Sequence, residues 1–268
     1  MERKLVKSAR DGDLNEVRLL MIEGVDPSNQ DNHAIKLAVV NGHIQVVKLL
    51  LPDLRVNPAA EDNYCIRIAS AKGYTDIVEL LLQDDRVDPS AKDNYAITIA
   101  SEKGYIDIVG LLLQDPRVDP SDNNNSAIRA ASSKGRLGVV RLLLQDARVD
   151  PSDNNNAAIL EAIFHKRWNV VRLLAQNQGI DNDQELFYWA ISKNKKYEVN
   201  ILKSLPSVNP GADNNHGLLI AVSVKNQSIA GSLLEDPRVQ IKGDIQVAID
   251  YARKIRDTGM VELLTKYM

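Results

Sequence analysis

A proline recurs along this chain at a fixed step of 31 residues. The prolines are Pro27, Pro58, Pro89, Pro120 and Pro151, and four of these five follow an aspartate. Asparagine and alanine keep the same step, at Asn32, Asn63, Asn94, Asn125 and Asn156 and at Ala38, Ala69, Ala100, Ala131 and Ala162. Self-similarity at a fixed period predicts a repeat architecture, in which each unit buries its apolar face against its neighbours.

Each unit has the pattern of two short amphipathic helices joined by a tight turn. In the unit that begins at Asp93, apolar residues fall at helical spacing on both sides of Gly104. The glycine predicts a left-handed turn between the helices, and Asn94 is placed to cap the first helix by accepting a hydrogen bond from its first turn. Two prolines in the following Gln-Asp-Pro-Arg-Val-Asp-Pro-Ser segment predict an extended, turning connection. The sequence therefore predicts an all-α solenoid of stacked helix-turn-helix units.

We expect a single domain of about nine units over residues 1–268. The stretch 157–206 is degenerate, because the glycine position becomes Lys166 and the proline spacing fails until Pro210. The expected boundaries are 1–24 (N-terminal cap), 25–55, 56–86, 87–117, 118–148, 149–179, 180–207 (degenerate), 208–238 and 239–268 (C-terminal cap).

The segment from Ala38 to Leu51 follows the pattern A-x-x-x-G-(H/Y)-x-x-(V/I)-V-x-L-L-L. Repeated along nearly the whole chain, this pattern resembles the ankyrin repeat. The units are about two residues shorter than the family's usual period of about 33, and the family's Thr-Pro-Leu-His box is absent. Asn94 and Asn125 are the expected substitutes for the capping hydrogen bonds of that box.

The resemblance implies that a partner protein docks on the concave face formed by the loops and the first helices. The short unit with its Asp-Pro-Arg-Val-Asp-Pro loop is similar to arrays of large DNA viruses of amoebae and of protists. For a viral protein, that similarity implies a role at the interface between virus and host, in the host cytoplasm.

Charge and cysteine usage narrow the class of protein further. The formal net charge is -3 and the pI is about 5.9, so the general attraction to nucleic acid or to an anionic membrane is missing. Cys65 is the single cysteine, which excludes an intramolecular disulfide and a thiolate zinc cluster. No apolar run reaches the length of a signal-peptide core or a membrane span. We expect a monomeric, cytoplasmic protein.

The sequence contains no recognised catalytic, cofactor-binding or metal-binding constellation. His43 follows the turn glycine, where a structural hydrogen bond is expected, and Cys65 takes a position that alanine holds in other units. The Asp-Asn-Asn-Asn segments at 122–125 and 153–156 resemble a calcium loop, but they lack the glycine and the terminal glutamate of an EF-hand. We interpret them as turns and expect no enzyme, no cofactor and no metal.

The candidate partner-binding residues lie on the first helices and in the degenerate stretch. They are Tyr64, Arg67, Lys72, Tyr95, Lys103, Arg129, Lys134, Phe164, Trp168 and Trp189. The three lysines occupy the same position in successive units, just before the turn glycine. They could contact an acidic ridge on a partner, or they could complement helix dipoles and stay solvated. The two tyrosines could be binding anchors or could cover the next unit. The aromatic residues between Phe164 and Trp189 could be a hot spot or could fill the space where the repeat geometry changes.

Three functions are consistent with these patterns. The first is a protein-protein interaction module acting as a scaffold, adaptor or decoy. The second is a nucleic-acid binder that uses the lysine row and Arg129, which the acidic pI opposes. The third is an enzyme with a site between the sixth and seventh units around Glu161, His165 and Glu185, which a deep pocket there would indicate.

Overall fold

The computed structural model describes residues 1–178, 182–239 and 245–268, and these residues form helices and no strand. They divide into two compact units, residues 1–170 and 171–268, and the division falls within α12. The expected unit boundary at residues 179 and 180, and residues 240–244 of the expected C-terminal cap, lie outside the described residues.

The helices of the first compact unit are α1 (Glu2–Asp11), α2 (Leu14–Ile22), α3 (Asn29–Val40), α4 (Ile44–Leu50), α5 (Ala60–Lys72), α6 (Thr75–Leu82), α7 (Ala91–Lys103), α8 (Ile106–Gln114), α9 (Asp122–Lys134), α10 (Leu137–Leu143), α11 (Asp153–Phe164) and the start of α12 (Trp168–Asn177). The second compact unit contains the rest of α12 and α13 (Asp183–Ser192), α14 (Lys196–Lys203), α15 (Ala212–Ser223), α16 (Gln227–Leu234), α17 (Ile245–Lys254) and α18 (Thr258–Thr265).

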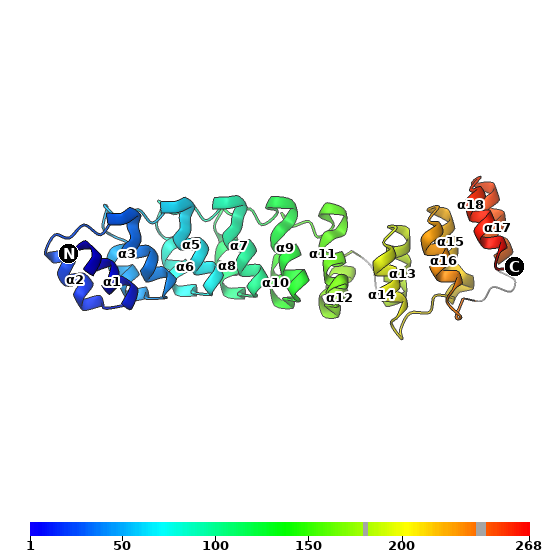
Figure 1. Ribbon diagram of the computed structural model, residues 1–268, viewed down its shortest axis with the longest axis horizontal. Coiled ribbons are helices and arrows are strands. Elements are labelled where there is room, and N and C mark those ends of the chain that lie inside the picture. The colour runs from blue at the N-terminus through cyan, green and yellow to red at the C-terminus, as the bar shows by residue number, and fades with distance from the viewer. Residues whose placement is uncertain (179–181, 240–244) are drawn as a thin grey trace. The chain divides into compact units, whose positions relative to one another are not determined.

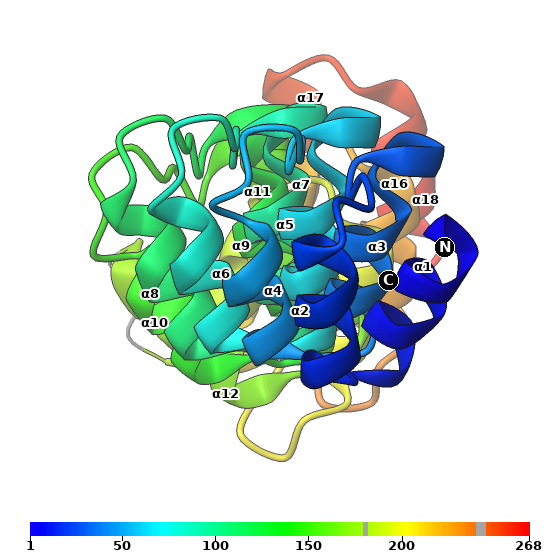
Figure 2. The same ribbon diagram turned by 90° about the vertical axis from the view of Figure 1, so that its left-hand side faces the viewer.

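Within each compact unit the helix pairs stack in chain order, which confirms the predicted helical repeat solenoid. In the first, α1, α3, α5, α7, α9 and α11 pack one against the next and form the row of first helices, while α2, α4, α6, α8 and α10 form a parallel row of second helices (Figure 1). Figure 2 shows α4, α6, α8 and α10 following one another beside the first helices. In the second compact unit, α13, α15 and α17 pack in series, as do α14, α16 and α18.

The repeated alanine of the first helices lies at the centre of the stack. Ala38, Ala69, Ala100, Ala131 and Ala162 have no exposed surface. A methyl side chain lets neighbouring helix backbones approach closely, while apolar residues of the second helices such as Val78 and Leu81 close the core from the other side. The prediction that this alanine column is a packing feature is confirmed.

The turn glycines take the left-handed conformation that the sequence predicts. Gly73, for example, has φ +78° and is the C-cap of α5. In the degenerate unit Lys166 adopts the same conformation, with φ +56°. The turn therefore keeps its shape after the glycine is lost, at the cost of a strained non-glycine residue.

The predicted capping role of the repeated asparagines is wrong. Asn94 and the two residues before it all have left-handed φ angles, so the right-handed part of α7 begins only after it. The side chain of Asn94 reaches the next unit, where its Oδ1 accepts a hydrogen bond from the backbone N–H of Asp119 at 2.9 Å and its Nδ2 donates to Asp122 at 2.9 Å. Asn32, Asn63 and Asn125 make the equivalent bond to the next loop. These asparagines link neighbouring units rather than cap their own helices.

The loop arginines link the units in the opposite direction. Arg117 binds Asp115 through two guanidinium nitrogens, at 2.9 and 2.6 Å, and its Nη1 donates to the carbonyl oxygen of Val87 in the preceding unit at 2.7 Å. Arg86, Arg148 and Arg238 repeat this arrangement. The Asp-x-Arg-Val segment therefore links each unit to the preceding one. The prediction of an extended, turning connection did not include this link.

Candidate protein-binding face

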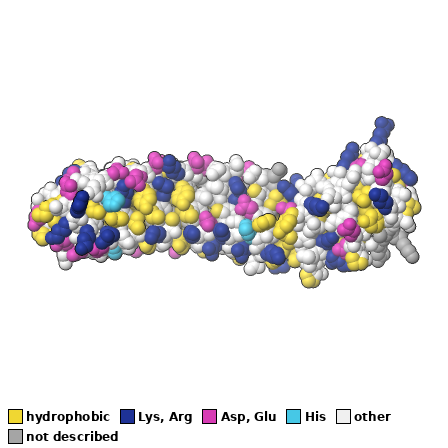
Figure 3. Space-filling model, viewed as in Figure 1, with side chains coloured by type: hydrophobic (Ala, Val, Ile, Leu, Met, Phe, Trp, Pro, Cys, Tyr) yellow, Lys and Arg dark blue, Asp and Glu magenta, His cyan; other side chains and the backbone are white. Residues whose placement is uncertain are grey.

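The first helices of the first compact unit present four aromatic and aliphatic side chains on the side away from the core. On α5, Tyr64 and Ile68 are partly exposed, and on α7, Tyr95 and Ile99 take the same positions, with Tyr95 40% exposed. Residues four apart on a helix share a face, and α5 packs beside α7. These four residues form one surface, which we call the aromatic patch, and Figure 3 shows hydrophobic side chains gathered over α5 and α7 (Figure 3).

Arg67 contacts the aromatic patch through the ring of Tyr95 and is held by two backbone carbonyl groups of its own unit. Its Nε donates to the carbonyl oxygen of Asp62 at 2.9 Å and its Nη2 donates to that of Glu61 at 3.0 Å. Its Cζ lies 5.8 Å from the centre of the Tyr95 ring, within the range of a cation-π attraction. Arg67 therefore fixes the left-handed turn of its own unit and orients the tyrosine of the next unit. The structure brings Arg67 and Tyr95 together, and Tyr64 lies on the same helix as Arg67. The part of all three residues in binding stays a prediction.

Other residues in the same helical position as Arg67 also join neighbouring units. Lys36 is buried and pairs with Asp31 and Glu61. Burial alone lowers the pKa of Lys36, but hydrogen bonds to Glu61 and Asp31 outweigh that effect and raise it. Arg129 lies 3.4 Å from Glu161 on the next first helix. Arg129 is thus partly occupied by an ion pair, which leaves less of its charge for a partner.

The three lysines of the predicted row end three adjacent first helices. Lys72, Lys103 and Lys134 are exposed at the C-termini of α5, α7 and α9. Lys134 lies 3.8 Å from Glu102, whereas the other two make no ion pair within the described ranges. Each lysine is placed to interact favourably with the dipole of its own helix. On the face of the first compact unit that Figure 3 shows, many of the acidic side chains lie along the upper edge and many of the basic side chains along the lower edge.

A comparison with known protein families identifies this architecture. The family model described as ankyrin repeats (3 copies) matches residues 5–93 and 95–186. The chain belongs to the ankyrin repeat family. A search of curated proteins finds no match. Ankyrin repeats generally mediate protein-protein interaction and are typically non-enzymatic.

The aromatic residues of the degenerate ankyrin units fall in both compact units. Phe164 is 54% exposed at the end of α11, with its ring edge-on to His165 at 4.9 Å between centres, and Trp168 is partly exposed at the start of α12. In the second compact unit Phe187 is fully buried and Trp189 is partly exposed. Phe187 therefore fills the core, as the packing interpretation expects, while Phe164 faces solvent for more than half of its surface.

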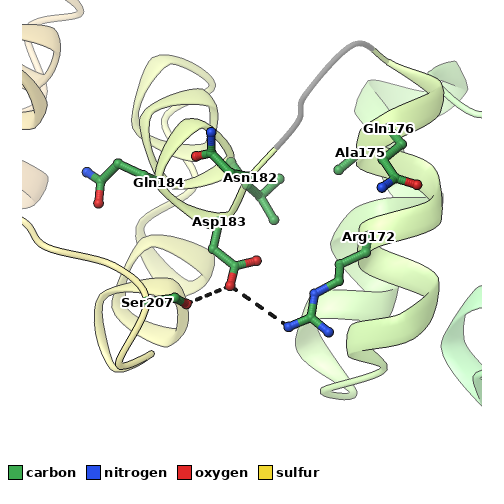
Figure 4. A pocket seen from close by; sticks show the side chains of 8 residues that line it. Arg172, Ala175, Gln176, Asn182, Asp183, Gln184 and Ser207 are labelled. Atoms are coloured by element: carbon green, nitrogen blue, oxygen red, sulfur yellow. Dashed lines mark hydrogen bonds and ion pairs between the residues drawn. The ribbon is translucent and has the colours of Figure 1, made fainter.

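A cavity of about 380 Å³ lies between α12 and α13 of the second compact unit. Figure 4 shows Arg172 pointing toward Asp183, at 4.0 Å, and the hydroxyl of Ser207 donating to the same carboxylate at 2.6 Å (Figure 4). The residues that line this cavity do not include Glu161, His165 or Glu185, around which the sequence placed a possible enzyme site. The charged groups of the cavity satisfy one another, so its geometry indicates a structural ion pair more than a catalytic group.

The remaining chemical candidates have structural roles in this ankyrin array. The imidazole of His43 donates through Nε2 to the carbonyl oxygen of Arg10 at 2.8 Å, as predicted. Cys65 is 1% exposed, and burial raises the pKa of its thiol to about 12. No group of three or more His, Cys, Asp or Glu side chains among the described residues is arranged to hold a metal ion. No described helix is long and apolar enough to cross a membrane.

Two exposed arginines at the turns between first and second helices were not predicted from the sequence. Arg136 and Arg167 follow the turns at Gly135 and Lys166. The signal was present, since the same position holds His43, Tyr74 and Tyr105 in the earlier units and changes to arginine only here. A comparison of each repeat position along the chain, instead of a search for residues that recur, would have found them.

Proposed function

We propose that this ankyrin array binds another protein through the first-helix face of its first compact unit, with the aromatic patch at the centre of the contact. The observation that carries the proposal is the 40% exposure of Tyr95 on α7, next to the Arg67 guanidinium and on the same helix as the partly exposed Ile99. Rigid, exposed aromatic side chains are enriched among the residues that dominate protein interfaces. Arg67 holds the Tyr95 ring in place before binding, so little side-chain entropy is lost on association.

The contribution of Tyr95 follows from the area that a partner would cover. Tyrosine exposes about 200 Å² when free, so a side chain that is 40% exposed retains about 80 Å². Covering that area at about 25 cal/mol per Å² stabilises a complex by about 2 kcal/mol. Replacement by alanine should therefore weaken binding by about 30-fold.

The test compares two tyrosine variants of equal exposure. Purified wild type, Tyr95→Ala and Tyr251→Ala are used as bait in a lysate, because Tyr251 is 38% exposed on α17 and lies outside the aromatic patch. Proteins retained by the wild type are quantified by mass spectrometry, purified and titrated by calorimetry. We expect a partner whose affinity falls about 30-fold with Tyr95→Ala and stays unchanged with Tyr251→Ala. Equal retention by both variants would contradict the proposal.

The finer role that we propose is that of an adaptor or decoy, acting as a monomer in the cytoplasm. The similarity of the Asp-Pro-Arg-Val-Asp-Pro loop to arrays of large DNA viruses supports a host protein as the target. Identification of the partner tests this role, since a target encoded by the same genome as the array would contradict a decoy. Light scattering of the purified chain tests the monomer.

A further inference from the structure

The residue after each turn glycine packs on the glycine of the preceding unit. The ring of Tyr105 lies against Gly73, so that a Cβ on that glycine would approach the ring within 2.8 Å. Arg136 and Arg167 lie in the same way against Gly104 and Gly135, where a Cβ would come within 2.9 and 2.8 Å of the arginine Cδ. The aliphatic stem of the arginine thus replaces the tyrosine ring as the packing element, and the guanidinium extends beyond it.

These two guanidinium groups are held by one nitrogen only. The Nε of Arg136 donates to the carbonyl oxygen of Glu102 at 2.9 Å, and the Nε of Arg167 donates to that of Ser133 at 3.2 Å. Neither arginine makes an ion pair or a further hydrogen bond within residues 1–178, 182–239 and 245–268. The loop arginine Arg117, by contrast, has its guanidinium occupied by Asp115 and a carbonyl oxygen. The terminal nitrogens of Arg136 and Arg167 are therefore oriented and available to an anion.

The surrounding sequence changes in the same direction. Exposed Lys134 and Lys166 lie in the two turns that carry these arginines. The second position of the following helix is acidic in two earlier units, at Asp76 and Asp107, and becomes Gly138 and Asn169 here. Positive charge is thus added and negative charge removed at the same two turns.

A shallow cavity connects the two turns. It has a volume of about 350 Å³ and is lined by Lys134, Lys166, Arg167 and Trp168, among others. Of the two lysines, Lys134 makes a long ion pair with Glu102 at 3.8 Å, and Lys166 makes no ion pair within the described residues. The partly exposed Trp168 adds an apolar wall beside the charges. The cavity can therefore accept an acidic side chain together with its aliphatic stem.

We propose that a basic turn cluster binds the carboxylates of an acidic segment of the partner protein. The cluster consists of Lys134, Arg136, Lys166 and Arg167. This proposal rests on the proposed function, because the segment belongs to the protein bound on the first-helix face. Neighbouring first helices pack about 8–10 Å apart, so two carboxylates about 10 Å apart match the two arginines. That spacing occurs between residues i and i+7 of a helix.

An acidic protein segment fits this surface better than a nucleic acid. The net charge of the chain is -3, and the opposite, N-terminal ends of α5 and α7 carry exposed carboxylates. Glu61 and Asp62 there pair with Lys36 and Lys92, whereas Asp93 makes no ion pair in the described part of the chain. A continuous polyanion lying across the face would be repelled there, whereas a protein segment can place its acidic residues at one edge only.

The first experiment measures binding of a fluorescein-labelled octaglutamate peptide by anisotropy at low ionic strength. The test variant is Arg136→Tyr/Arg167→Tyr, which restores the residue found at this turn in Tyr74 and Tyr105 and so preserves packing on the preceding glycine. The control variant, Arg18→Tyr/Arg141→Tyr, removes the same charge from exposed positions on α2 and α10. We expect the test variant to weaken binding by about tenfold or more and the control to change it by less than about twofold.

Three results would overturn the proposal. Equal weakening by both variants would show bulk charge attraction, and an undetectable affinity of the wild type would show that the cluster does not bind carboxylates. Tighter binding of a single-stranded oligodeoxynucleotide of the same charge would assign the cluster to nucleic acid instead.

The same variants separate this proposal from the proposed function. A partner that depends on Tyr95 but binds equally to wild type and Arg136→Tyr/Arg167→Tyr would leave the proposed function standing and remove the acidic segment. Octaglutamate binding that depends on the arginines, without any partner that depends on Tyr95, would contradict the proposed function and leave an anion site of this chain.

Discussion

Two asparagines in the turn at the start of α9 allow two effects on stability to be measured apart. One is the tolerance of asparagine for the left-handed conformation, and the other is the set of hydrogen bonds that its side chain makes to the next unit. Asn124 and Asn125 have the same residue type and nearly the same φ, 56° and 55°. Asn124 is exposed, whereas Asn125 is 4% exposed and its side chain joins two units. Its Oδ1 accepts from the N–H of Asp150 at 2.9 Å and its Nδ2 donates to the carboxylate of Asp153 at 2.9 Å.

The expected magnitudes follow from this difference. Alanine at either position loses the tolerance of asparagine for the left-handed conformation, which costs about 1 kcal/mol. Asn125→Ala also removes a neutral hydrogen bond, at about 1 kcal/mol, and a charge-assisted one, at about 1.5–3 kcal/mol. We expect Asn124→Ala to lower the free energy of unfolding by about 1 kcal/mol and Asn125→Ala to lower it by about 3.5–5 kcal/mol. Asn125→Gly, which has no left-handed penalty, should recover about 1 kcal/mol of the larger loss.

Urea unfolding followed by circular dichroism measures these differences, and hydrogen exchange at the Asp150 amide gives a local readout. That amide should exchange faster in Asn125→Gly and keep its wild-type rate in Asn124→Ala, because only Asn125 binds it. Equal losses of stability in the two alanine variants would refute the reasoning, since they would show that conformation alone sets the cost. An unchanged Asp150 exchange rate in Asn125→Gly would refute the link between units.

Three further outcomes are expected. Ser101→Ala should raise the free energy of unfolding by about 1 kcal/mol in thermal melts, because the buried Ser101 hydroxyl has no hydrogen-bond partner in the described part of the chain; a destabilised variant would contradict this. The hydrogen bond from Arg117 lowers the pKa of Asp115. The ionised Asp115 therefore stabilises the fold above the unfolded pKa of about 3.9, and this stabilisation is lost as the pH falls below that value. The urea midpoint should fall less steeply with decreasing pH in Asp115→Asn than in the wild type, and equal slopes for the two proteins would contradict a contribution of the Asp115–Arg117 pair. Cys65 is 1% exposed and the pKa of its thiol is raised to about 12. The thiol should therefore react with an aromatic disulfide reagent only at the rate of local opening. Rapid labelling of the native protein would contradict the burial of this thiol.

Much of the fold could be predicted from the sequence, because helical spacing, the repeated alanine and the turn glycine each have one structural meaning. The role of Asn94 could not be predicted, since a conserved step along the chain shows that a polar residue is needed in each unit but not which backbone group it binds. Its partner, the N–H of Asp119, belongs to the next unit and comes close only after stacking. The link from Arg117 to Val87 was missed for the same reason. Arg136 was missed because a residue that breaks the repeat carries no periodic signal.

The links between units explain how exposed residues of the first-helix face can differ from unit to unit while the stack persists. Arg117 bonds to the backbone carbonyl of Val87 and Asn94 accepts from the backbone N–H of Asp119, so these two bonds do not depend on the side chain at their destination. The same holds at the basic turn, where Arg136 donates to the carbonyl oxygen of Glu102. The second bond of Asn94 does need the side chain of Asp122. A substitution at an exposed position that takes no part in these bonds then changes the surface without breaking the bonds between units. Because tyrosine and arginine both pack on the preceding glycine, the turn position can hold either an aromatic or a cationic side chain while this contact between units is kept.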